Sequence, residues 1–162
     1  MKRVQEDLRY DGATVEQVYE MLGTQKFRES VCDYQRVLRH DVTVNQVGET
    51  MSVSIDQDHA TDRLPGFAKK FVGESTRAIT TQVWQGRAAT VEVETPGKPT
   101  SIAGSATLAE NGTGSTLTYD LDVKASVPLV GGKLEKLVVE LTTEGFDKEQ
   151  AVGAAWLAGE RA

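Results

Sequence analysis

The chain has one cysteine in 162 residues, Cys32, so a disulfide within the chain cannot support its fold. It has no block of Lys and Arg and no strand that interleaves basic with aromatic residues, which argues against nucleic acid as a partner. Its apolar runs are too short to cross a bilayer, and the charged, alternating residues 1–10 do not form a secretory signal. We therefore expect a cytoplasmic protein without a transmembrane segment.

What is present is an ordinary globular composition. Hydrophobic residues make up 39% of the chain and charged residues 26%, and the net charge of -6 comes from acidic and basic residues mixed along the whole length. No internal repeat, linker or low-complexity segment interrupts the sequence. Because this length suits one hydrophobic core, we expect a single domain over residues 1–162.

The clearest element is a long helix predicted between Val130 and Ala158. Its apolar residues recur at intervals of three and four, which is typical of one helical face packed against a core. The residues of this predicted face are Leu134, Leu137, Val138, Leu141, Gly145, Val152 and Trp156. At 1.5 Å per residue the helix would be roughly 40 Å long, so we expect the rest of the fold to be arranged around it.

Two glycines in this helix need a reason, because a glycine inside a helix costs about 1 kcal/mol relative to alanine. Gly145 lies on the predicted apolar face and Gly153 on its flank. Either a bulky side chain of the neighbouring layer approaches the helix closely at the glycine, or the missing side chain leaves room for a ligand. The sequence favours neither explanation over the other.

Most of the chain before this helix has the period of two that is typical of strands. Residues 3–10 form the first predicted strand. Thr14 and Gln17 then form a capping box for a short helix, and Thr24 can cap a second one. Six further strands are predicted at residues 38–45, 51–56, 76–84, 89–95, 101–108 and 115–125, with a non-strand insert at residues 58–72.

This order, β-α-α-β6-α, resembles the helix-grip fold of the START and Bet v 1-like (SRPBCC) superfamily, which includes polyketide cyclases and lipid-transfer domains. In detail, the insert Arg63–Val72 and the helix opening Val127–Leu137 resemble an uncharacterised group of such proteins from actinobacteria. The resemblance implies an α+β fold, with a curved seven-stranded antiparallel sheet wrapped around the long C-terminal helix and two short helices beside it. It also implies a hydrophobic cavity between sheet and helix, in which members hold lipids, sterols, aromatic polyketides or plant hormones.

Three polar residues fall on strand faces that alternation assigns to the interior: Glu6 on the first strand, His40 on the second and Tyr119 on the last. In the implied fold the first two strands would be neighbours, so Glu6 and His40 could meet at the cavity. A carboxylate beside an imidazole can orient a polar ligand or move a proton. The alternative is that these two residues only pair with each other or reach water, and that Tyr119 is an ordinary core tyrosine.

The predicted ligand-binding residues combine these polar groups with apolar residues expected to face the cavity. They are Glu6, His40, Met51, Val53, Phe67, Phe71, Tyr119, Leu121, Leu141 and Gly145. Phe67 and Phe71 belong to the insert, whose apolar residues have helical spacing. The insert is either a small amphipathic lid that turns its cations Arg63, Lys69 and Lys70 outward, or a loop folded against the sheet edge.

No catalytic or metal-binding motif is recognisable. Asp56, Asp58, His59 and Asp62 lack the glycine and the distal glutamate of a calcium loop, so we interpret them as a solvated acidic turn. Cys32 lies on the apolar side of a predicted helix and is expected to be a small core residue. The sequence therefore predicts no metal, no cofactor and no catalytic residue.

Three functions stay open. The leading hypothesis is the binding or transport of a hydrophobic small molecule, lipid-like or aromatic, in the cavity between the sheet and the C-terminal helix. The second is a polyketide cyclase- or aromatase-like enzyme that uses the same cavity, and the third is a co-chaperone-like protein-interaction module. Each is compatible with a transient contact with a membrane surface, and the sequence decides neither the ligand nor the oligomeric state.

Overall fold

A computed structural model describes residues 1–160 of the chain. The strands are β1 (Lys2–Asp11), β2 (Arg39–Val47), β3 (Thr50–Ala60), β4 (Ser75–Gln85), β5 (Ala88–Glu94), β6 (Thr100–Glu110) and β7 (Gly114–Ala125). The helices are α1 (Val15–Leu22), α2 (Gln25–Gln35), α3 (Gly66–Val72) and α4 (Gly131–Leu157). The predicted succession of elements is confirmed, and the insert contains the short helix α3.

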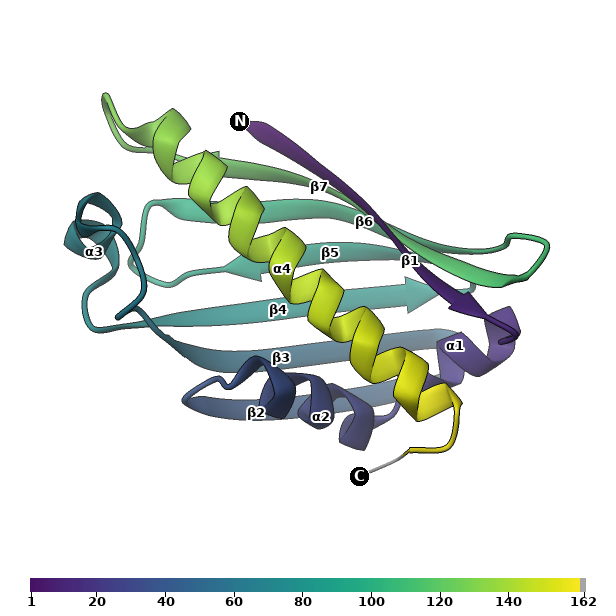
Figure 1. The fold of residues 1–162 in the computed structure, drawn as a ribbon. Helices are drawn as coiled ribbons and strands as arrows, with labels where there is room; N and C mark the ends of the chain where they lie inside the picture. The colour runs from purple at the N-terminus through teal and green to yellow at the C-terminus, as the bar shows by residue number, and fades with distance from the viewer. Residues whose placement is uncertain (161–162) are drawn as a thin grey trace.

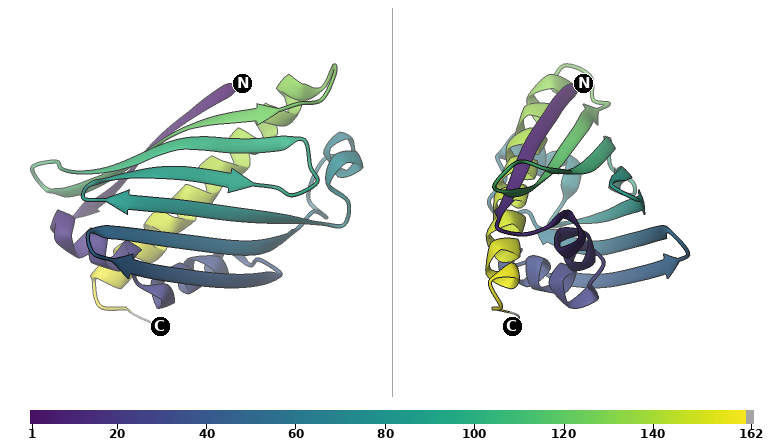
Figure 2. Two further views of the ribbon diagram at one scale, coloured as in Figure 1. Left: turned by 180° about the vertical axis from the view of Figure 1, so that it is seen from behind. Right: turned by 90° about the vertical axis from the view of Figure 1, so that its right-hand side faces the viewer.

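All these strands join one antiparallel sheet in the order β1-β7-β6-β5-β4-β3-β2. The sheet is curved, and α4 crosses its concave side diagonally, as Figures 1 and 2 show. α1 and α2 lie beside the C-terminal half of α4, while α3 lies at the opposite end of the sheet (Figure 1). The backbone of α4 packs mainly against β1, β7 and α2. This arrangement is the predicted α+β helix-grip fold.

Threonines precede the first residues of α1 and α2. The backbone N–H of Gln17 donates to Thr14 Oγ1 at 3.1 Å, and the N–H of Thr14 donates to the Gln17 side chain at 2.8 Å. The predicted capping box is therefore confirmed. Thr24 precedes α2, but its hydroxyl donates to the carbonyl of Glu20 at 2.8 Å and does not cap the helix. The predicted side-chain cap of α2 is wrong, because the end of α1 lies close enough to bind that hydroxyl.

Most of the predicted apolar face of α4 turns inward; its buried or partly buried residues are Leu134, Leu137, Val138, Val152 and Trp156. Leu141 is instead 45% exposed. Glu135, Glu149 and Gly153 are also buried, although they lie outside the predicted face. The periodicity therefore located the inward side of α4 but not the two glutamates on it. Charges on this face need partners from elsewhere in the fold.

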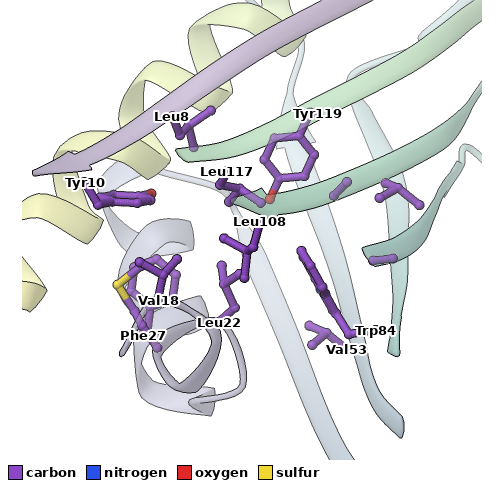
Figure 3. Close-up of a cluster of buried hydrophobic side chains, with 14 of the residues drawn as sticks. Leu8, Tyr10, Val18, Leu22, Phe27, Val53, Trp84, Leu108, Leu117 and Tyr119 are labelled. Carbon is purple, nitrogen blue, oxygen red and sulfur yellow. The ribbon is translucent and has the colours of Figure 1, made fainter. Parts of the chain in front are cut away.

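The main core fills the space between the concave side of the sheet and the C-terminal half of α4 (Figure 3). Trp84 and Phe27 are completely buried. The ring of Tyr19 meets Trp84 edge to face at 6.4 Å, and Phe27 meets Trp156 in the same way at 5.8 Å. These aromatic contacts fix α1, α2 and α4 against the sheet at one end.

A second, smaller apolar cluster holds the other end of α4. Its buried residues are Ala68 of α3, Ala125 at the end of β7 and Leu134 in the first turn of α4. Phe67 and Phe71 of α3 pack against this cluster and are partly buried. α3 is therefore a helix packed against the start of α4, rather than a loop folded on the sheet edge.

Candidate functional site

Five side chains with polar atoms form a buried polar cluster between the sheet and the helices. They are Arg28 from α2, Gln82 and Trp84 from β4, Tyr119 from β7 and Glu149 from α4. Each is at most 8% exposed. Because water does not reach them, their donors and acceptors must find partners inside the protein. The cluster brings together four elements that are far apart in the sequence.

Arg28 and Gln82 form the half of the cluster nearest α2. The Nε of Arg28 donates to the carbonyl of Leu22 at the end of α1 at 2.8 Å, and its Nη2 donates to Gln82 Oε1 at 3.0 Å. The indole N–H of Trp84 donates to the same Gln82 oxygen at 3.0 Å. Strand alternation places Gln82 and Trp84 on the same face of β4, so one amide oxygen serves both donors.

Glu149 and Tyr119 form the half nearest α4. The Tyr119 hydroxyl donates to Glu149 Oε2 at 2.8 Å, and Arg28 Nη1 lies 3.9 Å from Glu149 Oε1. Phe146, one turn earlier on α4, stacks on the Tyr119 ring with centroids 4.1 Å apart. Burial raises the pKa of Glu149 above its usual range, against the opposing effects of the Arg28 cation and the Tyr119 hydroxyl. Burial also raises the pKa of Tyr119, so its hydroxyl keeps its proton and acts as the donor.

Tyr10 of β1 lies beside the buried polar cluster, but no member of the cluster forms a hydrogen bond with its hydroxyl. The Tyr10 side chain is 2% exposed, and its hydroxyl has no hydrogen-bond partner among residues 1–160. Burial is the main cause that raises its pKa, and the nearby Glu149 charge acts in the same direction. Its ring packs against α4 at Gly153, where a Cβ would lie 2.6 Å from Tyr10 Cε1. The close approach of an aromatic ring therefore explains the glycine at position 153.

The buried polar cluster offers a cation, a protonated phenol and a carboxyl whose pKa is raised. Such groups can orient a carbonyl or a carboxylate, and a tyrosine–glutamate pair can hold or transfer a proton. Because every member is at most 8% exposed, a ligand would contact the cluster only after a side chain or α4 itself moved. The cluster is closed in the structure described here.

A strip of apolar residues on the concave face of the sheet is less well covered. Ile55 of β3, Val93 of β5 and Ile102 of β6 form this inner strip, and all three are only partly buried. Val93 pairs directly with Ile102, and Ile55 and Val93 both pair with Thr80 of the strand between them, so their side chains share one face. The backbone of α4 packs mainly on β1 and β7 instead. The inner strip is thus apolar surface that points inward without being fully enclosed.

Two pockets of the structure lie elsewhere. One, of about 390 Å³, is bounded by Thr61, Asp62, Lys69, Gly73 and Glu74 around α3. Another, of about 170 Å³, lies between α1 and the end of α4. Neither coincides with the predicted cavity between sheet and helix, where the buried polar cluster occupies the middle of the space. The cavity therefore stays a prediction.

Two of the predicted polar site residues do not meet. Glu6 on β1 and His40 on β2 lie on opposite edges of the sheet, so the expectation that their strands are neighbours is wrong. His40 Nε2 instead contacts Asp33 Oδ1 of α2 at 3.1 Å. Glu6 pairs in register with Tyr119 and is partly buried. Alternation within a strand predicts which of its side chains face the core. It does not predict which other strand lies beside it in the sheet.

The remaining predicted residues separate into three groups. Met51, Val53, Tyr119 and Leu121 point into the protein as expected and are at most 2% exposed, so they are core residues, and Tyr119 belongs to the buried polar cluster. Phe67 and Phe71 pack on the start of α4. Leu141 is exposed, so its predicted place in the cavity is wrong.

The predicted role of Gly145 is also wrong. It faces α2 rather than the sheet, where its carbonyl accepts a 3.2 Å hydrogen bond from Gln35 Nε2. A Cβ at position 145 would lie 3.6 Å from that nitrogen, an ordinary contact. Gly104 of β6 allows the backbone of β7 at Asp120 and Leu121 to approach closely. Neither glycine leaves space for a ligand.

The acidic residues near the end of β3 bind arginines. Arg39 donates to Asp58 at 2.8 Å and to Asp56 at 2.7 Å, and Arg77 donates to Asp56 at 2.6 Å. The hydrogen bonds from Arg77 and Arg39 lower the pKa of Asp56 to about 2. Within residues 1–160, no group of three or more His, Cys, Asp and Glu side chains is arranged to hold a metal ion. Cys32 is buried, as expected, and its sulfur accepts a hydrogen bond from Gln57 Nε2 at 3.0 Å.

The signals for the missed residues were weak but present. Arg28 directly follows the apolar Phe27 in α2, and Gln82 shares the inward alternation of Trp84. Glu149 lies seven residues before Trp156, so the two lie close to the same helical face. A buried charge looks like a surface charge in a hydropathy pattern, and only its partners distinguish the two.

A curved antiparallel sheet that grips a long C-terminal helix defines the helix-grip class, the START and Bet v 1-like fold. Within this class the chain belongs to a family described as "Protein of unknown function (DUF2505)", whose model matches residues 6–157. No curated protein matches the sequence. Among residues 1–160, no helix is both long enough and apolar enough to cross a membrane.

Solved structures agree with this class. TTHA0849 from Thermus thermophilus is similar with a TM-score of 0.65 and 18% identity, over 99% of this chain and 100% of that one. The di-domain ARO/CYC StfQ from the steffimycin biosynthetic pathway is similar with a TM-score of 0.62 and 12% identity, over 94% of this chain and 49% of that one. A STAR-related lipid transfer protein from Xanthomonas axonopodis gives 0.52 and 19%, over 92% and 84%. At these identities the likeness establishes the fold alone.

Proposed function

We propose that this protein binds a hydrophobic small molecule, lipid-like or aromatic, between the concave face of its sheet and α4. The observation that carries the proposal is the inner strip of Ile55, Val93 and Ile102, which points inward and is still only partly buried. Apolar surface left incompletely covered on a concave face is what an apolar ligand can cover. Each square ångström buried would contribute about 25 cal/mol.

The two ends of α4 pack against different clusters, and this difference indicates where a ligand could enter. The start of α4 is held by the small cluster with α3, and its C-terminal half is held by the main core. Movement of α3 and the first turns of α4 would widen the space beside the inner strip, two of whose residues, Ile55 and Ile102, pack at the edge of the main core. The buried polar cluster would then lie at the deep end of the opened space, where Arg28 or Tyr119 could orient a polar group of the ligand.

Binding of an apolar fluorescent probe to the purified, delipidated protein tests this proposal. Ile102→Asn places an amide on the inner strip and should weaken probe binding by about tenfold, because the apolar contact is lost. Ile79→Asn is the matched control, since Ile79 is also partly buried but lies on the other face of the sheet, opposite Asp56 and Glu94. It should leave binding unchanged. Equal binding by both variants and the unaltered protein would overturn the proposal.

Native mass spectrometry of the freshly purified protein would give a second, independent reading. A co-purifying apolar molecule would support binding and identify its class. If the probe does not bind and the protein carries no molecule, the space between sheet and α4 is filled by side chains alone.

An enzymatic function of the cyclase kind is the second candidate, and one observation favours it. Tyr119 and Glu149 share a hydrogen bond in a site that raises the pKa of both groups, which is an arrangement suited to proton transfer. The structurally similar StfQ is described as a di-domain ARO/CYC from the steffimycin biosynthetic pathway. Tyr119→Phe separates the two functions: a carrier should keep its probe affinity, whereas an enzyme should keep affinity and lose turnover.

A further inference from the structure

One end of the molecule concentrates positive charge in an acidic protein. Residues 61–74, which contain α3, and residues 124–136, which lead into α4, form this basic end. Figure 1 shows α3 and the start of α4 at the same end of the sheet, and Figure 2 shows the same from behind. They are in contact there, since Lys133 Nζ lies 4.3 Å from the centre of the Phe67 ring.

The charges of the basic end are accessible and only partly compensated. Its six cations are Arg63, Lys69, Lys70, Lys124, Lys133 and Lys136, and all are exposed. The same segments contain three acidic residues. One of these, Glu135, is buried and binds the N-terminal amine at 2.9 Å. Among residues 1–160, none of the six cations forms an ion pair. The net charge of the whole chain is -6, so the rest of the molecule is more acidic than that total.

A leucine projects from the middle of this basic end. Leu129 is 106% exposed, the largest exposure among the large hydrophobic side chains described. Its φ of 69° lies in the left-handed region, which a leucine rarely adopts. The turn is fixed by the backbone, because the N–H of Val130 donates to the carbonyl of Pro128 at 2.8 Å and that of Gly131 donates to Val127 at 3.0 Å. The chain thus holds an aliphatic side chain outward among lysines.

From these observations we infer that the basic end docks on an anionic lipid surface. The lysines would neutralise lipid phosphates while Leu129 enters the boundary between headgroups and acyl chains. Charge complementarity also sets the orientation, because the acidic remainder of the molecule is repelled from the same surface. One leucine and a few cations give weak, reversible, salt-sensitive binding. This inference goes beyond the proposed ligand and does not depend on it.

The side chains of the basic end fit an anionic lipid surface better than a single-stranded nucleic acid. Single-stranded nucleic acid is bound by cations together with exposed aromatic rings on which bases stack. Here the ring of Phe67 is covered by Lys133, and Phe71 packs against the apolar cluster at the start of α4. The exposed apolar group is aliphatic, and it matches the interior of a membrane surface better than the face of a base.

Sedimentation with vesicles at low ionic strength tests the inference. The protein should bind vesicles made of phosphatidylglycerol and phosphatidylcholine in equal parts, and should not bind vesicles of phosphatidylcholine alone. Lys69→Gln with Lys70→Gln should weaken binding by about fivefold for each lysine removed. Leu129→Asn should weaken it by about tenfold, and asparagine tolerates the left-handed backbone of this turn.

Matched control variants lie at the other end of the sheet. Val47 is 76% exposed at the end of β2, so Val47→Asn removes a comparable apolar side chain there. Arg9→Gln with Lys26→Gln removes two exposed cations away from α3. Both controls should bind the anionic vesicles like the unaltered protein.

The possible results are distinguishable. No binding to anionic vesicles overturns the inference, and so does an equal loss in the control variants. Binding that depends on Lys69 and Lys70 but not on Leu129 would also overturn it, because that pattern indicates a site for polyanions such as nucleic acid or an acidic protein. A protein that binds vesicles but no apolar probe would keep this inference and remove the proposed function.

Discussion

The hydroxyl of Tyr119 on β7 donates a 2.8 Å hydrogen bond to Oε2 of Glu149 on α4, in the interior of the protein. This bond joins the sheet to the helix that crosses it. Arg28 brings α2 to the same carboxylate, at 3.9 Å. A polar group that is buried in a low-dielectric interior without a partner destabilises the fold, because water cannot replace the missing partner. The position of α4 therefore depends on polar contacts as well as on apolar packing.

Removing the Glu149 carboxylate should destabilise the protein strongly. Glu149→Ala leaves the Arg28 cation buried without its counter-charge, which typically costs about 3–5 kcal/mol. Tyr119→Phe removes one hydrogen bond and should cost about 1–2 kcal/mol. Urea unfolding measures both. Glu144→Ala is the control on the same helix, because Glu144 is exposed and pairs with Lys148 at the surface, at 3.5 Å, so its loss should change little. An equal effect of the two glutamate substitutions would contradict the burial of this charge network.

The raised pKa of Glu149 predicts a pH dependence of stability. Burial raises the folded pKa above the usual 4.5, so the folded protein keeps this proton to higher pH than the unfolded chain does. The contribution of Glu149 is therefore fully present below pH 4.5 and falls as pH rises through the folded pKa. Glu149→Gln cannot ionise and should not show this fall. The free energy of unfolding of the unaltered protein, relative to this variant, should decrease as pH rises, and a constant difference would contradict the prediction.

The two glycines in the interior of α4, Gly145 and Gly153, should respond in opposite directions to alanine. At Gly153 the new Cβ would lie 2.6 Å from Cε1 of Tyr10, whose buried ring has little freedom to move, so the substitution should cost about 1–3 kcal/mol. At Gly145 the new Cβ would lie 3.6 Å from Gln35 Nε2, and the better helix propensity should stabilise the protein by about 0.5–1 kcal/mol. Thermal unfolding of both variants measures the difference. Stabilisation at position 153 would show that Tyr10 does not pack there.

The threonines before α1 and α2 form another matched pair. Thr14→Ala removes a side-chain cap with a 3.1 Å hydrogen bond and should cost about 1 kcal/mol. Thr24→Ala removes only the bond from its hydroxyl to Glu20, and no helix cap is lost. The first substitution should therefore lower the denaturation midpoint more than the second. The reverse order would mean that the capping box contributes little to α1.

Local pattern in the sequence was enough for the order of the elements, and the resemblance of that order to the helix-grip fold predicted the fold class. Alternation along residues 115–125 predicted the last strand, and Leu117, Tyr119 and Leu121 are buried as that alternation requires. The capping box at Thr14 marked the start of α1. Periodicity works for these features because each depends on which residues of one segment face the core.

The candidate site needed more than periodicity. Tyr119 was predicted to face the interior, but Arg28 and Glu149 were not recognised as its neighbours, and Glu6 and His40 were expected to meet and do not. A buried charge is stable only where a partner from a distant segment reaches it. That meeting depends on the strand order and on the rotation of α4, which a single segment does not encode.

The sequence by itself determined the seven strands, the short helices and the long terminal helix, because those features follow from local periodicity and turn chemistry. The resemblance of their order to the helix-grip fold predicted the class. Only the tertiary structure decided that Glu135 and Glu149 of α4 are buried and that Leu129 projects among lysines at one end. It also decided that β1 and β2 lie on opposite edges. The physical reason is that burial and charge pairing are properties of contacts between segments, and these exist only after the chain has folded.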